Sequence, residues 1–277
     1  MPAQLAPFDE IARTLLAPLP APARTAMTAF AAFGRAGSAI ARDVRLPISR
    51  RQGLLDGLDA LLADRKPDVP LALPVSAAAR DMVLGAQAAG VDLLHARHLL
   101  QALRQDCAKT RYRDWGDWLL YARFAAAPYA RALIEATGER PEALPAAEAL
   151  ACASLLLGQL QDCAADHRAD GKVYLPERWL RDHGAVVEDL ALAKASPAWR
   201  AVFADASRQA GQLLTAAGPL PGLLSDKGLR GASAGALVLT RRWASRLAKG
   251  DPLGDPVRLS ALDRLRARAA AAWRRRS

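Results

Sequence analysis

Two aspartates four residues apart, Asp162 and Asp166, are the first candidates for chemistry in this sequence of 277 residues. Because an α-helix has about 3.6 residues per turn, side chains at this spacing lie one above the other on the same face. The pair follows the apolar run 146–161, where burial would strengthen the repulsion between the carboxylates. Mg²⁺ would relieve it, since this ion binds one or two carboxylates and completes its shell with water and phosphate oxygens. Two solvated acids at a helix end are the alternative interpretation.

The residues after this pair supply positive charge. The stretch HRADGKVYLPERWLRDHG contains Arg168, Lys172 and Arg178, with Gly171 suited to a tight turn and Pro176 to a helix stop. Cations beside a carboxylate pair are suited to holding a diphosphate that a metal ion already bridges. The segment therefore predicts a site for a diphosphate substrate.

This segment resembles a known motif. The run QLQDCAADHRADGKVYLP is similar to the second aspartate-rich motif of the squalene/phytoene synthase family, followed by that family's G-[RK]-V-Y-[LI]-P signature. The resemblance implies that Asp162 and Asp166 bind Mg²⁺ and that Lys172 binds the substrate diphosphate. Gln161 stands where phytoene synthases usually carry arginine.

An upstream segment resembles one branch of this family more closely. The run RQDCAKTRYRDWGDWLLYARFAAAP is similar to the hydroxysqualene synthase branch of bacterial hopanoid biosynthesis. The resemblance implies four catalytic residues that line a cavity and steer a carbocation: Asp106, Arg111, Tyr112 and Tyr121. These polar residues are interleaved with apolar helical positions, as expected for a lined cavity, although a solvated face would explain any one of them alone.

The family's first aspartate-rich motif is degenerate here. The run FAAFGRAGSAIARD occupies its place, and the resemblance implies that Arg35 binds diphosphate. Ser38, Ala39 and Arg42 stand where the family has aspartates. Arg42 has two interpretations, because a guanidinium can bind phosphate oxygens or form an ion pair with Asp162 or Asp166.

The composition predicts the elements that position these residues. Hydrophobic residues make up 52% of the chain and aromatic residues only 5%, and alanine and leucine carry most of the apolar fraction, which favours helices over strands. The resemblance implies an all-α, single-domain isoprenoid-synthase bundle with a central cavity over residues 1–277, with 1–22 poorly matched and 258–277 forming a basic helix. Predicted helices span 22–43, 50–64, 75–88, 91–105, 114–137, 146–166, 186–195, 197–217, 229–248 and 258–275.

The net charge and the cysteine content indicate which kinds of partner the protein binds and in which compartment it lies. Three cysteines without a C-x-x-C pair cannot build a disulfide framework, which favours a reducing, cytoplasmic setting. The net charge is +10, with much of the excess in the arginines after residue 257. No base-reading motif accompanies it, so we expect no nucleic-acid partner. Such a basic C-terminus either binds an acidic lipid surface, here peripherally at the inner membrane face, or keeps the protein soluble.

Two functions remain open at this point. By resemblance, the chain is an enzyme of isoprenoid and hopanoid biosynthesis that converts presqualene diphosphate to hydroxysqualene with loss of diphosphate and uses Mg²⁺. The alternative is a catalytically degenerate relative that acts as a binding or assembly protein. The missing aspartates around Ser38 and Arg42 favour the second function, whereas Asp106, Asp162 and Asp166 favour the first.

Overall fold

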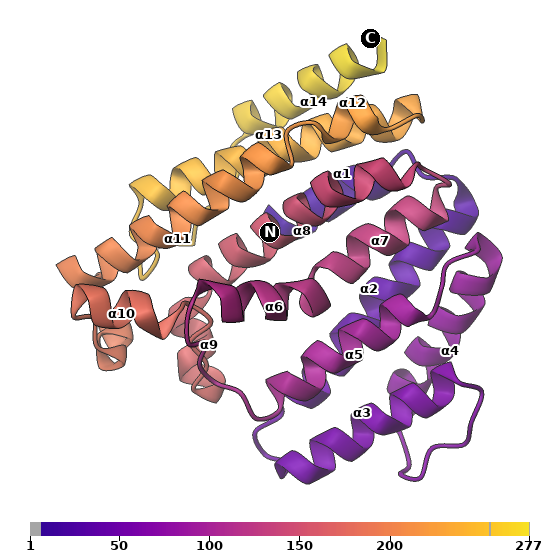
Figure 1. The fold of residues 1–277 in the computed structure, drawn as a ribbon, viewed down its shortest axis with the longest axis horizontal. Helices are drawn as coiled ribbons and strands as arrows, with labels where there is room; N and C mark the ends of the chain where they lie inside the picture. The colour runs from indigo at the N-terminus through magenta and orange to yellow at the C-terminus, as the bar shows by residue number, and fades with distance from the viewer. Residues whose placement is uncertain (1–6, 255, 277) are drawn as a thin grey trace.

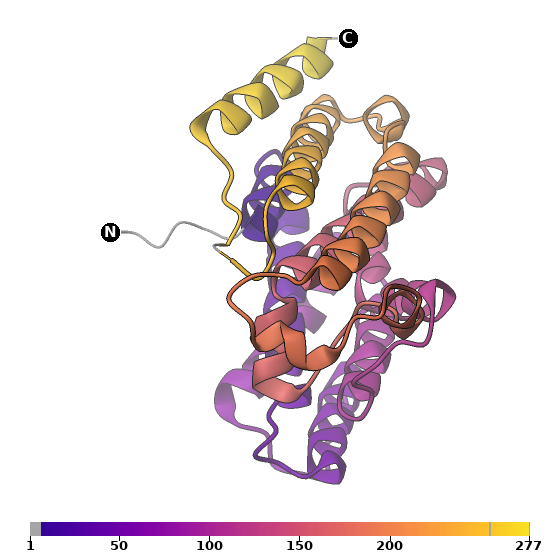
Figure 2. The same cartoon turned by 90° about the vertical axis from the view of Figure 1, so that its left-hand side faces the viewer.

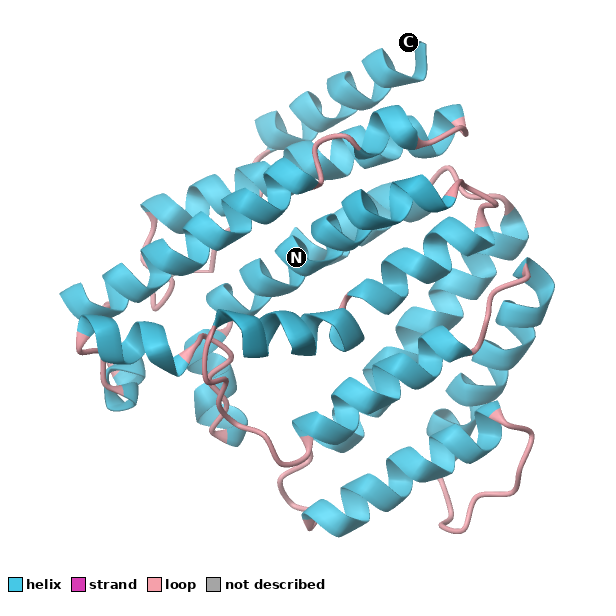
Figure 3. Cartoon of the chain, viewed as in Figure 1, coloured by secondary structure: helices cyan, strands magenta, loops and turns pink. Residues whose placement is uncertain are grey.

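About three quarters of the protein is helical (Figure 3). The computed structural model describes residues 7–254 and 256–276, and its only β-type pairing in those residues is one isolated bridge between Arg111 and Val173. The prediction of an all-α fold is confirmed. The α-helices are α1 (Pro7–Leu16), α2 (Ala21–Ala41), α3 (Ile48–Leu62), α4 (Leu73–Ala89), α5 (Leu94–Asp106), α6 (Trp115–Ala125), α7 (Ala127–Ala136), α8 (Leu144–Gln161), α9 (Cys163–Asp170), α10 (Glu177–His183), α11 (Pro197–Ala216), α12 (Leu220–Leu223), α13 (Lys227–Lys249) and α14 (Ala261–Arg276).

The helices form a bundle around α8 (Figure 1). Helices α7 and α11 both pack against α8, which therefore joins the half of the bundle built from α2 to α7 to the half built from α11 to α14. By length and composition, the segment Pro141–Gln161 resembles a membrane span, but 67% of its apolar window is buried by the rest of the protein. This segment, which contains α8, is therefore a core helix of the bundle.

Helix α14 is the outermost element of the C-terminal half. It packs against α13, which in turn contacts α1 and α11 (Figure 2). The predicted helix over 258–275 is therefore present as α14, which begins at Ala261.

The predicted helix over 114–137 is present in two parts. Asp114 caps α6, because its carboxylate accepts a hydrogen bond from the Asp117 amide at 2.9 Å. The chain then breaks at Ala126, and α7 begins with Pro128 in its first turn. Proline has no N–H to donate to the preceding turn, which explains the break. Gly138 follows α7 with φ of +64°, a conformation that glycine adopts without strain.

The predicted helix over 146–166 is also divided. Helix α8 ends at Gln161 and α9 begins at Cys163, so Asp162 lies at the junction. The segment 167–184, which lies between two predicted helices, contains the rest of α9 and the short helix α10. The prediction over 186–195 corresponds to a 3₁₀ helix, Val187–Ala191.

The position of α2 is set by close packing. A Cβ added at Gly34 would meet the hydroxyl of Tyr129 on α7, and one added at Gly37 would meet the side chain of Leu103 on α5. Small residues here let α2 approach both helices closely. The consequence is that the end of α2, with Arg42, is held at a defined place beside α9.

Candidate functional site

Two loops that are about 60 residues apart in sequence bring the predicted residues together. The Val173 amide donates to the Thr110 carbonyl at 3.0 Å, and the Glu177 amide donates to the Tyr112 carbonyl at 2.7 Å. The guanidinium of Arg111 donates to the carbonyl oxygen of Gly171. The segments KTRY and GKVYLP, which were matched separately to the family, therefore run side by side.

Asp106 is the centre of a buried polar cluster between these loops. Its Oδ1 accepts hydrogen bonds from Lys172 Nζ at 2.5 Å and from the Tyr174 hydroxyl at 3.3 Å. Its Oδ2 accepts a hydrogen bond from the Tyr121 hydroxyl at 2.9 Å. Asp106, Lys172, Tyr121 and Tyr174 are all buried. The carboxylate is therefore neutralised by one ammonium and held by two hydroxyls, which satisfies the rule that buried charges are paired.

Three tyrosine rings cover this cluster. The ring of Tyr112 lies with its centroid 5.0 Å from that of Tyr121 and 5.7 Å from that of Tyr174. Burial, followed by the negative charge of Asp106, raises the pKa of all three hydroxyls, so the tyrosines stay protonated at neutral pH. The hydroxyl oxygen of Tyr112 is buried and accepts or donates no hydrogen bond of ordinary geometry within the described residues. The cluster thus presents neutral aromatic faces and one unsatisfied hydroxyl.

Arg42 faces the acids of α9. Its Nη2 donates to Asp166 Oδ1 at 2.7 Å, and its Nε donates to Asp170 Oδ2 at 2.6 Å. Of the two interpretations of Arg42, the structure contains the ion pair with Asp166, and the second partner is Asp170 and not Asp162. Burial opposes the charged form of Arg42, but the charge and hydrogen bonds of the two aspartates outweigh it and raise its pKa. The end of α2 and the face of α9 are therefore joined by a two-carboxylate clamp on one guanidinium.

The two predicted metal ligands lie in different surroundings. Asp166 is buried, whereas Asp162 is exposed at the junction of α8 and α9. Neighbouring protein atoms displace water and so raise the pKa of both carboxyls; the charge of Asp166 adds to the effect on Asp162, whereas Arg42 opposes the rise for both. Asp162 and Asp166 are thus near one another, as the spacing predicted.

The acids in this arrangement do not fit a resident Mg²⁺ ion. Asp166 and Asp170 each give one carboxylate oxygen to Arg42, so the guanidinium competes with a cation for these acids. In the described ranges 7–254 and 256–276, no group of three or more His, Cys, Asp or Glu side chains is arranged to hold a metal ion. The role of Asp162 and Asp166 as metal ligands stays a prediction.

We expect Asp162→Asn to stabilise the protein slightly at neutral pH. A raised pKa means that the folded state binds the proton more tightly, so this carboxyl contributes a penalty that grows as pH rises through its folded pKa. The amide removes that penalty. Urea unfolding should show a gain of less than about 1 kcal/mol at pH 7, because the side chain is exposed, and no gain at pH 3. An equal gain at both pH values would show that ionisation is not the cause.

The predicted diphosphate ligands are not together. Arg35 is exposed on α2 and lies on the same helical face as Ala39 and Arg42. It makes no ion pair in the described part of the chain. Lys172 is 3% exposed and pairs with Asp106 in the buried cluster. Contact between Lys172 and a diphosphate would require it to leave Asp106. The roles of both residues stay predictions.

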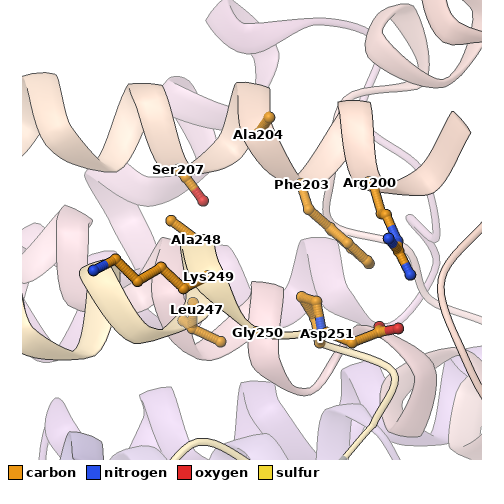
Figure 4. Close-up of a pocket in the computed structure, with 10 residues that line it drawn as sticks. Arg200, Phe203, Ala204, Ser207, Leu247, Ala248, Lys249, Gly250 and Asp251 are labelled. Atoms are coloured by element: carbon orange, nitrogen blue, oxygen red, sulfur yellow. The ribbon is translucent and has the colours of Figure 1, made fainter. Parts of the chain in front are cut away.

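The central cavity that the resemblance implies stays a prediction. The rings of Tyr112, Tyr121 and Tyr174 pack against one another beside Asp106. A cavity of about 330 Å³ lies elsewhere, where Phe203 and Ser207 of α11 point toward the end of α13 (Figure 4). None of the predicted site residues lines that cavity.

Sequence reasoning missed two members of the site, Asp170 and Tyr174. Asp170 lies four residues after Asp166 and so continues the same helical face, a signal that the sequence contained. Tyr174 lies inside the GKVYLP run, but nothing local indicates that its hydroxyl reaches Asp106, which is 68 residues away.

Comparisons with known proteins agree with this architecture. A solved dehydrosqualene synthase in complex with ligand has a TM-score of 0.76 at 18% identity, with 96% of this chain and 98% of that chain covered. A squalene synthase from Alicyclobacillus acidocaldarius has a TM-score of 0.63 at 20% identity, with 98% and 93% covered. At these identities the structures show a common fold.

Relatives found by sequence comparison identify the family of this chain. The hydroxysqualene synthase of Rhodopseudomonas palustris is 31% identical over 240 residues, which cover 87% of this chain and 80% of that protein. The hydroxysqualene synthase of Zymomonas mobilis is 27% identical, with 84% and 77% covered. Residues 14–266 match the profile of squalene/phytoene synthase. The chain therefore belongs to the squalene/phytoene synthase family, whose members act on prenyl diphosphates, generally with Mg²⁺.

Proposed function

We propose that this protein converts presqualene diphosphate to hydroxysqualene with loss of diphosphate. The observation that carries the proposal is the buried cluster around Asp106, in which Lys172, Tyr121 and Tyr174 converge from loops and helices distant in sequence. A buried charged cluster is costly to retain unless it has a use. Relatives that are 27–32% identical are hydroxysqualene synthases, which supports the same chemistry for this chain.

The proposed reaction needs a leaving group and a water molecule. The C–O bond to diphosphate breaks with both electrons leaving on the diphosphate, the C30 cation rearranges, and water adds to it with loss of a proton. The aromatic faces of Tyr112 and Tyr121 suit such a cation, because a ring quadrupole attracts positive charge. The raised pKa of each hydroxyl keeps these rings neutral while the cation exists.

In this proposal Arg42 receives the diphosphate. It is the guanidinium that faces the α9 acids and its side chain is 30% exposed, so an incoming anion reaches it without unfolding the bundle. The diphosphate oxygens would replace Asp166 and Asp170 as its hydrogen-bond acceptors. Asp106 would keep its bonds to Lys172 and Tyr121 and so hold the tyrosine rings in place.

A specific observation favours a second function, that of a binding or assembly protein without catalysis. Three carboxylates, Asp162, Asp166 and Asp170, face one guanidinium, Arg42, so this part of the site carries excess negative charge. Such a charge repels a diphosphate unless a further cation enters. Under this alternative, the clamp on Arg42 holds an unused site closed.

Turnover of presqualene diphosphate separates the two functions. The purified chain is incubated with presqualene diphosphate and Mg²⁺, and hydroxysqualene and released pyrophosphate are measured. We expect the wild type to form both products, and Asp106→Asn to lower kcat at least 100-fold because the tyrosines lose their anchor. Asp205→Asn, which removes an ion-paired carboxylate on α11 outside the cluster, should retain activity.

Two outcomes would reject the enzyme. A wild type that forms no hydroxysqualene but binds the substrate or a partner protein would establish the second function. Equal activity of Asp106→Asn and the wild type would show that the buried cluster does not take part in the reaction.

A further inference from the structure

The outward face of α14 is apolar and exposed. The inward face packs on α13, with Asp263 2% and Ala267 4% exposed. On the other side, the exposed fractions are 52% for Leu262, 60% for Leu265 and 73% for Trp273. Large apolar side chains with this exposure are uncovered in the structure, which is unusual for three residues on one helix.

These side chains form one stripe. Leu262, Leu265, Ala269 and Trp273 follow a spacing of three, four and four residues, which keeps them on the same side of a helix. At about 1.5 Å per residue the stripe is about 16 Å long. The stripe is as wide as one face of a helix. It therefore suits a surface into which the whole length of α14 can sink.

Cations border the stripe. Helix α14 carries six arginines and one aspartate, and that aspartate, Asp263, turns inward to Arg246 at 2.6 Å. Three exposed arginines on the outer side pair with no acidic residue in the described part of the chain: Arg266, Arg268 and Arg276. Two of them, Arg268 and Arg276, line a hollow of about 420 Å³ together with Ala271, Ala272 and Arg275. The outer side of α14 therefore offers guanidinium groups next to apolar side chains.

We propose that α14 lies in the surface of a bilayer that contains anionic phospholipids. The stripe of Leu262, Leu265 and Trp273 enters the boundary between headgroups and acyl chains, and the bordering arginines bind lipid phosphates. Neither signal alone gives stable attachment, whereas an apolar face together with a basic border does. This inference concerns a surface remote from Asp106 and holds whether or not the protein is catalytic.

The charge pattern favours a bilayer over two other occupants. A second copy packed on the same stripe by two-fold symmetry would bring the arginines of both α14 helices together, and like charges repel. A nucleic acid would pair with the arginines but would leave Leu265 and Trp273 in water. An anionic bilayer satisfies both the charges and the apolar side chains.

Vesicle co-sedimentation of the full chain tests the proposal. We expect the wild type to bind vesicles of phosphatidylglycerol and phosphatidylcholine, and to bind pure phosphatidylcholine at least tenfold more weakly. Arg268→Gln should lower binding to the anionic vesicles about fivefold, since each cation near such a surface contributes about that factor. Leu265→Glu should lower it at least tenfold. The matched control is Leu84→Glu, because Leu84 on α4 is 63% exposed and lies outside α14.

A second readout reports insertion directly. Brominated phosphatidylcholine in the anionic vesicles should quench tryptophan emission of the wild type, because Trp273 would lie among the acyl chains. Trp273→Phe keeps an apolar side chain and should still sediment with the vesicles, but without that quenching. The other tryptophans therefore serve as an internal reference.

Several results would overturn the proposal. Absence of binding to anionic vesicles, equal binding to pure phosphatidylcholine, or equal losses for Leu265→Glu and Leu84→Glu would each do so. A dimer that Leu265→Glu dissociates, without vesicle binding, would assign the stripe to a second copy. Binding to duplex DNA without binding to vesicles would assign the arginines to nucleic acid.

Discussion

The triple variant Ser38→Asp, Ala39→Asp, Arg42→Asp is expected to bind Mg²⁺ at least tenfold more tightly than the wild type in the presence of pyrophosphate. The change removes the guanidinium that now occupies oxygens of Asp166 and Asp170. It also places new carboxylates at the end of α2, which faces α9. Mg²⁺ prefers carboxylate and phosphate oxygens, so ion and pyrophosphate should bind together. Isothermal calorimetry with each ligand alone and with both measures the effect.

Without Mg²⁺ the same variant should be less stable than the wild type by about 3 kcal/mol, because removal of one partner leaves a partly buried carboxylate uncompensated. Addition of Mg²⁺ should restore the melting temperature. Arg45→Asp is the matched control, since Arg45 is three residues further on, largely exposed and paired with Asp43. If Mg²⁺ binding and stability of the triple variant match those of Arg45→Asp, the end of α2 does not complete a cation site.

Asp106→Asn is expected to lower the free energy of unfolding by about 4 kcal/mol. The substitution leaves the ammonium of Lys172, which is 3% exposed, without a counter-charge. It also weakens the hydrogen bond from Tyr121. For a chain of this size, a loss of this magnitude lowers the melting temperature by roughly 10 °C. Urea unfolding and calorimetry measure both quantities.

The double variant Asp106→Leu, Lys172→Met separates pairing from burial. An apolar pair of similar volume often replaces a buried ion pair at little cost, so the double variant should be more stable than Asp106→Asn. Asp117→Asn is the control, because Asp117 pairs with Lys109 at 2.6 Å but both side chains are partly exposed. A loss for Asp106→Asn no larger than that for Asp117→Asn would mean that the buried charge of Lys172 is relieved in another way.

The helical content and the local matches to the family could be predicted from the sequence, because they depend on composition and on the spacing of residues close together in the chain. The sequence was insufficient for helix ends that depend on tertiary context. Pro128 lay inside a predicted helix, yet the structure uses it to start α7. Asp162 was predicted inside a continuous helix and lies between α8 and α9. In both cases the hydrophobic pattern continues across the break, so it gives no signal of the interruption.

Side-chain partners were the harder part of the site. The ion pair between Arg42 and Asp166 was one of two interpretations of the sequence, and it requires that the two family motifs face each other, as they do in the structure. Lys172 was expected at the diphosphate because it lies beside the acids in sequence. Its carboxylate partner, Asp106, is 66 residues away, and only the fold shows that pairing. Long-range pairing of buried charges depends on how the loops meet, which local spacing does not encode.

The backbone hydrogen bonds between the KTRY and GKVYLP segments have a consequence for local opening. The amides of Val173, Glu177 and Arg178 all donate to carbonyl oxygens of residues 110–113. Amide protons held in this way exchange with solvent only when the partner segment also separates. The two loops therefore form one cooperative opening unit. We therefore expect Asp106 and Lys172 to become hydrated together when this unit opens.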